Sequence, residues 1–597
     1  MECDFVMATV KKMVLDGEQR QSYEDLVLGI DLGTTNSAVG IYRAFDVPIL
    51  HPMNNNGRHT LPSCVKWKGG SEFVVGEEAY AERYKPNVIY SVKRMMGSND
   101  PIILSLRQDG TIPTLGDPDW NPETDLALLP EEVSAMILKE LVDKVRDSYP
   151  GVYRCIITVP AYFDQKQIEA TIKASKLASL ECLQVLKEPT SASYIYSLLG
   201  YARDGSVLVY DLGGGTCDIT HLSFIRKDAV PRPLLTSLKR QYGIDTAELF
   251  KDSADSPYYC QVLGTYGNSR LGGDDIDRHM AEICAKASGC TDLTDDEFEQ
   301  LIFKCEQFKK NNYDGLETYI GGHKINMSLN HLHEAIKVVY YKTMDLMSDI
   351  GDDELNQVST IVLVGGSTKS DYLVQLIESA FPGKEISRVL DPDATVALGA
   401  SAVARDLQNG KGLMYQDVLP LPIGIVVNES TIDVCVKKNT AMPYSVTRQF
   451  STMYDNQKAI SLDVYQGISS VPSECTYLGR LRFADLPQVP AGDVKVYVSF
   501  ILSAQGRLRI CSKIAGTEKE EQLIVDNIFN VADAPIGETA QITSLSEFSY
   551  DEFEVGIADL LVGNEKAREL ILARRFALES GDASKAEELE AAVLEVL

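Results

Sequence analysis

Two short turns carry an aspartate and a run of small residues that could bind phosphate. Asp31 is followed by Leu-Gly-Thr-Thr and Asp211 by Leu-Gly-Gly-Gly-Thr, and each turn comes directly after an apolar stretch. Glycine lets the backbone bring its N–H groups close to an anion, and threonine hydroxyls add donors. Carboxylates suit Mg²⁺, which prefers oxygen ligands and keeps part of its water shell. For either turn taken alone, a glycine-rich hairpin is the alternative.

Two further glycine pairs strengthen the phosphate interpretation. Gly-Gly-Asp-Asp stands at 272–275, and Gly-Gly-Ser-Thr stands at 365–368 after the apolar stretch 360–364. The repeated Asp turn after a strand predicts a duplicated unit with a shared cleft. The P-loop pattern is absent, and His333-Glu334 lacks the second histidine of a helical zinc-protease motif.

The hydrophobic periodicity of the sequence predicts the helices and strands that position these turns. From 27 to 409, short Val/Ile/Leu stretches alternate with longer helical patterns, which predicts an α/β domain. One such helix begins after Thr294, with Glu297 completing a capping box. From 418 to 530, short alternating stretches between Gly and Pro turns predict an all-β sandwich. The remaining ranges are interpreted as an N-terminal extension (1–26), a linker (410–417) and a short helical tail (544–597).

Composition limits the class of protein. The chain has 597 residues, too many for one ordinary domain, and 44% of them are hydrophobic, which predicts a multidomain globular protein. The net charge of −29 disfavours nucleic acid and anionic membranes as partners. The 12 cysteines include no Cys-x-x-Cys pair and are interpreted as core residues in a reducing compartment. With neither a signal peptide nor a long apolar run, the sequence predicts a cytoplasmic protein.

The motifs then resemble a known family. GIDLGTTNSAVGI, ITVPAYFDQKQ, KEPTSASYIY, VYDLGGGTCDIT, LGGDDID, VLVGGST and DPDATVALGA occur in the order found in heat-shock protein 70 (DnaK-type) molecular chaperones. The resemblance covers about residues 27–530. It implies a two-lobed, actin-like ATPase domain followed by a β-sandwich that holds extended apolar peptides. With its short helical tail, the chain resembles a divergent, short-lidded member of this family.

The resemblance assigns roles to the matched positions. It implies catalytic roles for Lys93, Glu188, Asp31, Asp211, Thr216 and Asp218, with Asp31 and Asp211 reaching the metal through water. The implied nucleotide-binding residues are Gly33, Thr34, Thr35, Asn36, Gly213, Gly214, Gly215, Gly272, Gly273, Glu306, Lys309, Lys310, Tyr313, Gly365, Gly366, Ser367, Lys369 and Asp393. The implied peptide-binding residues are Ile425, Val427, Asn428, Phe450, Met453, Ile460 and Leu462.

Each group has a simpler interpretation. Lys93 alone could be a solvated surface lysine, Glu306 and its neighbours could form a solvated helix face, and the groove positions could be sandwich core. The implied cofactors are ATP or ADP with Mg²⁺, and K⁺ is a further option. The implied partners are unfolded proteins, a J-domain cochaperone and a nucleotide-exchange factor, with no nucleic acid and no membrane.

Several positions depart from the family pattern. Lys310 replaces an arginine, Tyr313 a serine, and Asn428 an apolar residue of the pair that arches over the peptide. Ile168 and Gln184 stand where basic residues are usual, and the linker reads Leu-Met-Tyr-Gln. An insertion lies around 226–260. The sequence therefore predicts a slow ATPase acting as a chaperone, with an uncoupled nucleotide-binding holdase or cochaperone as the alternative. An actin-like assembly ATPase and a sugar kinase are the more distant alternatives.

Overall fold

The computed structural model describes most of the chain between residues 26 and 525. The described ranges are 26–42, 48–54, 56–107, 111–115, 117–226, 258–290, 292–311, 313–408, 415–427, 431–442, 444–502, 508–515, 517 and 520–525. The expected N-terminal extension, the helical tail, most of the insertion and residues 410–414 of the linker lie outside these ranges.

The first lobe is built on a six-stranded sheet. Its strands follow the order β11-β10-β1-β2-β3, with β4 also paired to β2. Strand β1 runs parallel to β10 and antiparallel to β2. The bounds are β1 Val27–Asp31, β2 Asn36–Tyr42, β3 Pro48–Leu50, β4 Thr60–Pro62, β10 Arg154–Val159 and β11 Glu181–Lys187.

The second lobe repeats this pairing around its own sheet. The strand order is β18-β17-β12-β13-β14-β19, and β12 runs parallel to β17 and antiparallel to β13. The bounds are β12 Gly205–Leu212, β13 Cys217–Arg226, β14 Tyr258–Asn268, β17 Val358–Val364, β18 Glu385–Ser387 and β19 Tyr415–Gln416. Strands β1 and β12 therefore occupy equivalent places, as the repeated Asp turn predicted.

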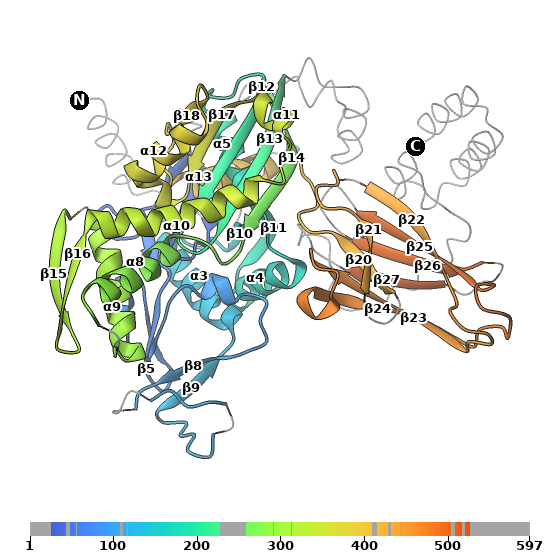
Figure 1. The fold of residues 1–597 in the computed structure, drawn as a ribbon, viewed down its shortest axis with the longest axis horizontal. Coiled ribbons are helices and arrows are strands. Elements are labelled where there is room, and N and C mark those ends of the chain that lie inside the picture. Colours follow the sequence, from blue (N-terminus) through green and yellow to red (C-terminus); the bar gives the residue numbers. More distant parts are fainter. Residues whose placement is uncertain are drawn as a thin grey trace.

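Helices cover both sheets (Figure 1). The longer ones are α3 Pro130–Arg146, α4 Gln165–Leu177, α5 Glu188–Leu198, α8 Gly273–Ala287, α9 Asp295–Asn311, α10 Leu329–Met347, α12 Asp371–Ala380 and α13 Thr395–Gln408. Helix α9 begins as predicted, because Glu297 N donates to Thr294 Oγ1 at 3.3 Å and Thr294 N donates to Glu297 Oε2 at 2.9 Å. Both members of the capping box are therefore in place.

Helices α5 and α13 cross closely. A β-carbon on Gly399 of α13 would lie 2.0 Å from the backbone oxygen of Ser191 in α5, so only glycine allows this approach. Helix α13 also packs against β1 and β2 of the first lobe. This packing fixes the N-terminus of α5, where Glu188 stands, next to the sheet that carries Asp31.

Smaller elements extend the two lobes. In the first lobe they are β5 Val65–Gly69, β6 Glu72–Val75, α2 Glu77–Tyr80, β7 Val88–Ile89, η1 Val92–Met95, β8 Ile102–Ser105 and β9 Asp125–Leu128. In the second they are β15 Gly315–Ile320, β16 His323–Ser328, α11 Asp352–Gln357 and η3 Gly366–Lys369.

The described residues from 418 to 525 form two four-stranded sheets, as their alternation predicted. The strand orders are β21-β20-β23-β24 and β22-β25-β26-β27, drawn in orange to red in Figure 1. The bounds are β20 Ile423–Val427, β21 Thr431–Val436, β22 Tyr444–Ser451, β23 Ala459–Gln466, η4 Pro472–Glu474, β24 Thr476–Ala484, β25 Lys495–Leu502, β26 Leu508–Ile514 and β27 Glu520–Val525. Alternate side chains of β25 are buried between the sheets.

The sandwich packs against both lobes. Thr476 Oγ1 donates to Asp164 Oδ2 at 2.6 Å at the start of α4, and Thr265 N of β14 donates to Asn439 Oδ1 at 3.0 Å. Strand β19 adds the linker to the edge of the second lobe's sheet, beside β14. Among the described residues, no helix is long and apolar enough to cross a membrane.

Candidate nucleotide site and family membership

Asp31, Asp211 and Asp218 lie close together where the two central strands end; Asp211 and Asp218 are buried and Asp31 is half-buried. Asp31 is the last residue of β1, and Asp211 of β12 pairs across the sheet with Asp218 of β13. Burial and the charge of Glu188 raise the pKa of Asp31 to about 7 and that of Asp218 to about 8. Burial and Glu188 also raise the pKa of Asp211 well above its usual range. The site is therefore short of positive charge.

Lys93 and Glu188 form a buried ion pair beside these aspartates. Lys93 comes from η1 and Glu188 from the first position of α5, and both side chains are almost fully buried. Burial alone would lower the pKa of Lys93, but the charges of Glu188 and Asp31 outweigh it and leave the pKa raised. Lys93 is thus a fixed ammonium in the cleft and is no solvated surface lysine.

The donor set fits magnesium in its hydrated form. Glu188 is already paired with Lys93, which leaves the aspartates to be balanced by a cation. Within the described ranges, no three His, Cys, Asp or Glu side chains are arranged to hold one metal ion directly. Mg²⁺ commonly keeps several waters and touches few carboxylates, so water-mediated contacts from Asp31 and Asp211 suit it.

The four predicted glycine turns converge. A β-carbon on Gly214 would lie 1.7 Å from Thr35 Oγ1, and one on Gly215 would lie 2.4 Å from Thr34 Cγ2. Gly273 N donates to the backbone oxygen of Gly213 at 2.9 Å. The first, second and third turns are therefore in contact across the cleft, and the Gly33-to-Asn36 turn faces the Gly213-to-Thr216 turn.

The fourth glycine turn, residues 365–368, directly follows β17 and contacts the second turn. Ser367 Oγ donates to the backbone oxygen of Gly213 at 2.8 Å. Gly365 has a φ of +82°, and a β-carbon there would lie 2.4 Å from Asp211 Oδ1. Lys369 pairs with Asp393 beside Gly366. Backbone from four segments thus comes together beside Asp211, an arrangement that suits binding of phosphate groups.

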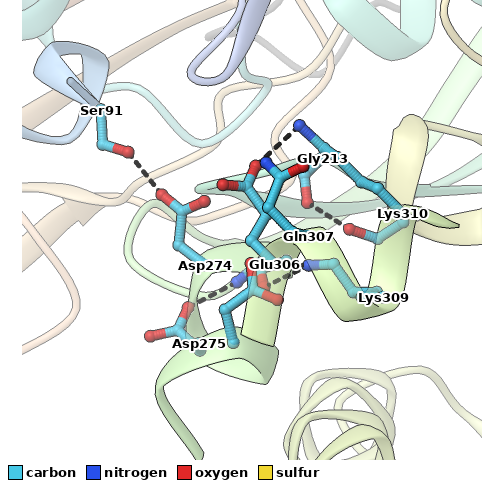
Figure 2. Close-up of polar contacts among 12 residues, drawn as sticks. Ser91, Gly213, Asp274, Asp275, Glu306, Gln307, Lys309 and Lys310 are labelled. Atoms are coloured by element: carbon cyan, nitrogen blue, oxygen red, sulfur yellow. Dashed lines mark hydrogen bonds and ion pairs between the residues drawn. The ribbon is translucent and has the colours of Figure 1, made fainter. Parts of the chain in front are cut away.

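Charged side chains of helix α9 contact the third glycine turn and its helix α8 (Figure 2). Lys309 Nζ donates to the backbone oxygen of Gly273 at 2.9 Å and to Asp277 Oδ2 at 2.8 Å. Lys310 Nζ lies 2.7 Å from Glu306 Oε1. Glu306 is nearly fully buried and is not solvated, whereas Lys309 is half-buried and Lys310 is exposed. Tyr313 is 43% exposed, with its ring 6.1 Å from that of Phe308.

Comparisons with known proteins agree with this geometry. The family model described as "Hsp70 protein" matches residues 27–228 and 259–541. The chain belongs to the Hsp70 family. It is 31% identical over 526 residues to the chaperone protein DnaK of Mycoplasmoides gallisepticum, a match that covers 84% of this chain and 80% of the relative. It is 30% identical over 525 residues to a chaperone protein HscA homolog of Acinetobacter baumannii, covering 85% of this chain and 79% of the relative.

Two arginines of this Hsp70 family member were missed from the sequence. Arg94 pairs with Asp275 at 2.5 Å and donates from Nε to the backbone oxygen of Gly215 at 2.9 Å. Its position directly after Lys93 was a signal that could have found it. Arg83 Nη2 lies 2.5 Å from Glu306 Oε2, and no motif marks its position in the sequence.

The linker of this family member is held by a lysine that sequence reasoning also missed. Lys187 Nζ donates to Asp417 Oδ1 and to the backbone oxygen of Val418, both at 2.9 Å, and the pair is buried. Gln184 Nε2 donates to the hydroxyl of Tyr415 at 3.1 Å. Two of the departures from the family pattern, Gln184 and the altered linker, therefore contact each other. Ile168 is buried in an apolar cluster.

The predicted peptide-groove residues divide by burial. Ile425, Ile460 and Leu462 belong to the buried core of the sandwich, whereas Phe450 is partly buried and packs against that core. Val427 is half-buried, and Met453 is 49% exposed in the loop after β22. Asn428 lies outside the described residues. The sandwich-core alternative fits the first three positions, and the groove stays a prediction.

Proposed function

We propose that this Hsp70 family member is an ATP-dependent molecular chaperone whose affinity for extended apolar segments of unfolded proteins is set by ATP binding and slow hydrolysis. The observation that carries the proposal is the linker. Its strand β19 extends the sheet of the second lobe, and its Asp417 is held by Lys187, the residue directly before Glu188. A change at Glu188 can therefore reach the linker through one peptide bond and the Lys187–Asp417 ion pair, and from there the sandwich.

Each group of residues in the site has its own role in the proposed hydrolysis. Mg²⁺, when bound, would neutralise phosphate oxygens and hold them in line for displacement. Lys93 holds a fixed positive charge where charge spreads over the transferring phosphoryl group. In this proposal Glu188 orients the attacking water, and the backbone N–H groups of the glycine turns bind the remaining phosphates.

The sandwich supplies the client site in this proposal. Met453 is exposed and Phe450 is partly buried, so both can contribute apolar surface next to exposed backbone. Extended peptides bind such a site through main-chain hydrogen bonds and a few apolar pockets, which tolerates many sequences. A J-domain cochaperone and a nucleotide-exchange factor are proposed partners, and the interior of a cell is the proposed location.

The test is peptide release. A labelled apolar peptide is bound to the full chain with ADP, its anisotropy is recorded, and ATP is added. We expect rapid release, and we expect Asp417→Asn to slow it about tenfold or more, because the substitution removes the negative charge that faces the buried ammonium of Lys187. Asp433→Asn, an exposed aspartate of the sandwich, is the matched control and should release like the parent. Peptide binding that ignores ATP in the parent protein would replace the proposal with the uncoupled holdase.

A further inference from the structure

Ser91 has a backbone conformation that serine rarely adopts. Its φ is +54°, in the left-handed region, and it directly precedes η1, the short helix that carries Lys93. Glycine adopts this region freely, and asparagine and aspartate adopt it more readily than other residues, whereas a serine there costs free energy. Strained backbone of this kind is found where the surrounding structure holds it in place. The side chain of Ser91 must therefore contribute something that glycine would not.

The hydroxyl of Ser91 donates to a carboxylate of the other lobe (Figure 2). The acceptor is Oδ2 of Asp274, the second residue of α8. The backbone N–H of Asp274 in turn donates to the backbone oxygen of Gly214 at 2.7 Å. Hydrogen bonds to a charged acceptor are stronger than those between neutral groups. Through one residue, Ser91 is thus tied to the second glycine turn, which the proposed function assigns to phosphate.

Lys93 is flanked by two contacts to that same glycine turn. On the C-terminal side of Lys93, Arg94 Nε donates to the backbone oxygen of Gly215 at 2.9 Å. On the N-terminal side, the hydroxyl of Ser91 makes the contact through α8. Between them, Val92 packs into the apolar core of the first lobe. Lys93 therefore stands on a short segment that both lobes hold.

A second serine with the same backbone shows that the conformation of Ser91 needs a separate explanation. Ser179 has a φ of +57° and lies two residues beyond the end of α4. A left-handed residue in that place is a common way to end a helix. Ser91 instead stands at the start of a helix, where an extended backbone is usual. Its hydrogen bond to the other lobe is the contact that accounts for the left-handed turn.

We propose that Ser91 is a positioning residue for Lys93. The inference rests on the proposed function, in which Lys93 holds positive charge near the transferring phosphoryl group. The bond from Ser91 to Asp274 stabilises the left-handed turn when α8 is in place beside the cleft. The ammonium of Lys93 is then fixed with respect to the phosphate-binding turn of the second lobe. Loss of the bond should slow hydrolysis and leave nucleotide affinity nearly unchanged, because the contact acts on Lys93 and not on the glycine turns.

The experiment measures hydrolysis and binding separately. Single-turnover hydrolysis of ATP by the full chain with Mg²⁺ gives the rate, and calorimetry with ADP gives the affinity. Ser91→Ala removes the hydroxyl and keeps the β-carbon that disfavours the left-handed turn. We expect it to hydrolyse ATP about tenfold more slowly and to bind ADP within about twofold of the parent. Ser91→Gly also loses the hydroxyl but adopts the turn without cost, so its rate should fall only about threefold.

Asp274→Ala tests the other end of the hydrogen bond. It should slow hydrolysis about as much as Ser91→Ala does, and the double variant should be within about twofold of Ser91→Ala alone, since two residues that act through one contact are not additive. Ser179→Ala is the matched control. It alters an exposed serine with the same backbone conformation and should hydrolyse ATP like the parent.

Three results would overturn the inference in a parent protein that hydrolyses ATP. The first is a change of less than about twofold in the rate of Ser91→Ala. The second is a double variant in which the losses at Ser91 and Asp274 multiply. The third is a fall in ADP affinity as large as the fall in rate, because it would assign Ser91 to binding. A parent protein that binds ADP but does not hydrolyse ATP would instead refute the proposed function, and the inference would fall with it.

Discussion

At the phosphate end of the site, backbone from four glycine turns comes together beside three aspartates, whose negative charge outweighs the nearby positive charge. At the nucleoside end, the long side chains of Glu306, Lys309 and Lys310 are all paired with other groups of the protein. The first arrangement leaves donors and charge for a ligand to satisfy. In the second, the charged side chains already pair within the protein. Among the described residues there, Arg83 Nε, Glu306 Oε2 and Asp277 Oδ1 lack a hydrogen-bond partner. With Mg²⁺ balancing the aspartates, we expect the protein to bind phosphates more firmly than nucleosides.

The largest expected effect lies at the phosphate end, on turnover. Lys93→Ala removes the one ammonium that pairs with Glu188, so charge on the transferring phosphoryl group loses a fixed partner. We expect the rate of ATP hydrolysis to fall about a hundredfold or more while ADP affinity stays within about threefold. Single-turnover hydrolysis and calorimetry measure the two quantities. Lys139→Ala, which alters an exposed lysine of α3, is the control. Retained hydrolysis in Lys93→Ala would remove Lys93 from the chemistry.

The next effect concerns binding at the same end. Gly214→Ala places a β-carbon 1.7 Å from Thr35 Oγ1, so the turns from the two lobes must move apart. We expect pyrophosphate and ADP to lose affinity together, by about tenfold to a hundredfold, because both depend on these turns. Gly351→Ala is the matched control, since a β-carbon at Gly351 would meet nothing within 4 Å. A loss confined to ADP would contradict the division of the cleft into two ends.

The two ends also differed in how far the sequence predicted them. The glycine turns were predicted because only glycine permits the close backbone approaches that join them. Each turn can be recognised from its own short stretch of sequence. The sequence also predicted the repeated strand pairing, because each lobe needs the same Asp at a strand end. These features depend on local backbone geometry, which sequence patterns express directly.

Arg83 and Lys187 could not be found in this way. Arg83 meets Glu306 from a segment of the other lobe, and Lys187 meets Asp417 from across the linker. Neither pairing has a periodicity or spacing that marks it, because long charged side chains reach partners that only the tertiary fold brings near. The groove residues stay a prediction for another reason. Alternation shows that Ile425 and Leu462 face inward, but sandwich core and peptide groove share that pattern.

The smallest expected effect lies at the nucleoside end, at Tyr313. This position departs from the family pattern, and a stacking role on the base is the interpretation that its ring suggests. Its side chain is 43% exposed and its nearest described ring is Phe308, so any stack it forms stays open to water. We expect Tyr313→Ala to lower ADP affinity by about twofold to threefold, the worth of an exposed aromatic contact, and to leave pyrophosphate affinity unchanged. Tyr319→Ala, another exposed tyrosine of the second lobe, controls for loss of surface area. A tenfold loss for ADP alone would show that stacking holds the base firmly, and the nucleoside end would then count as a strong site despite its internal ion pairs.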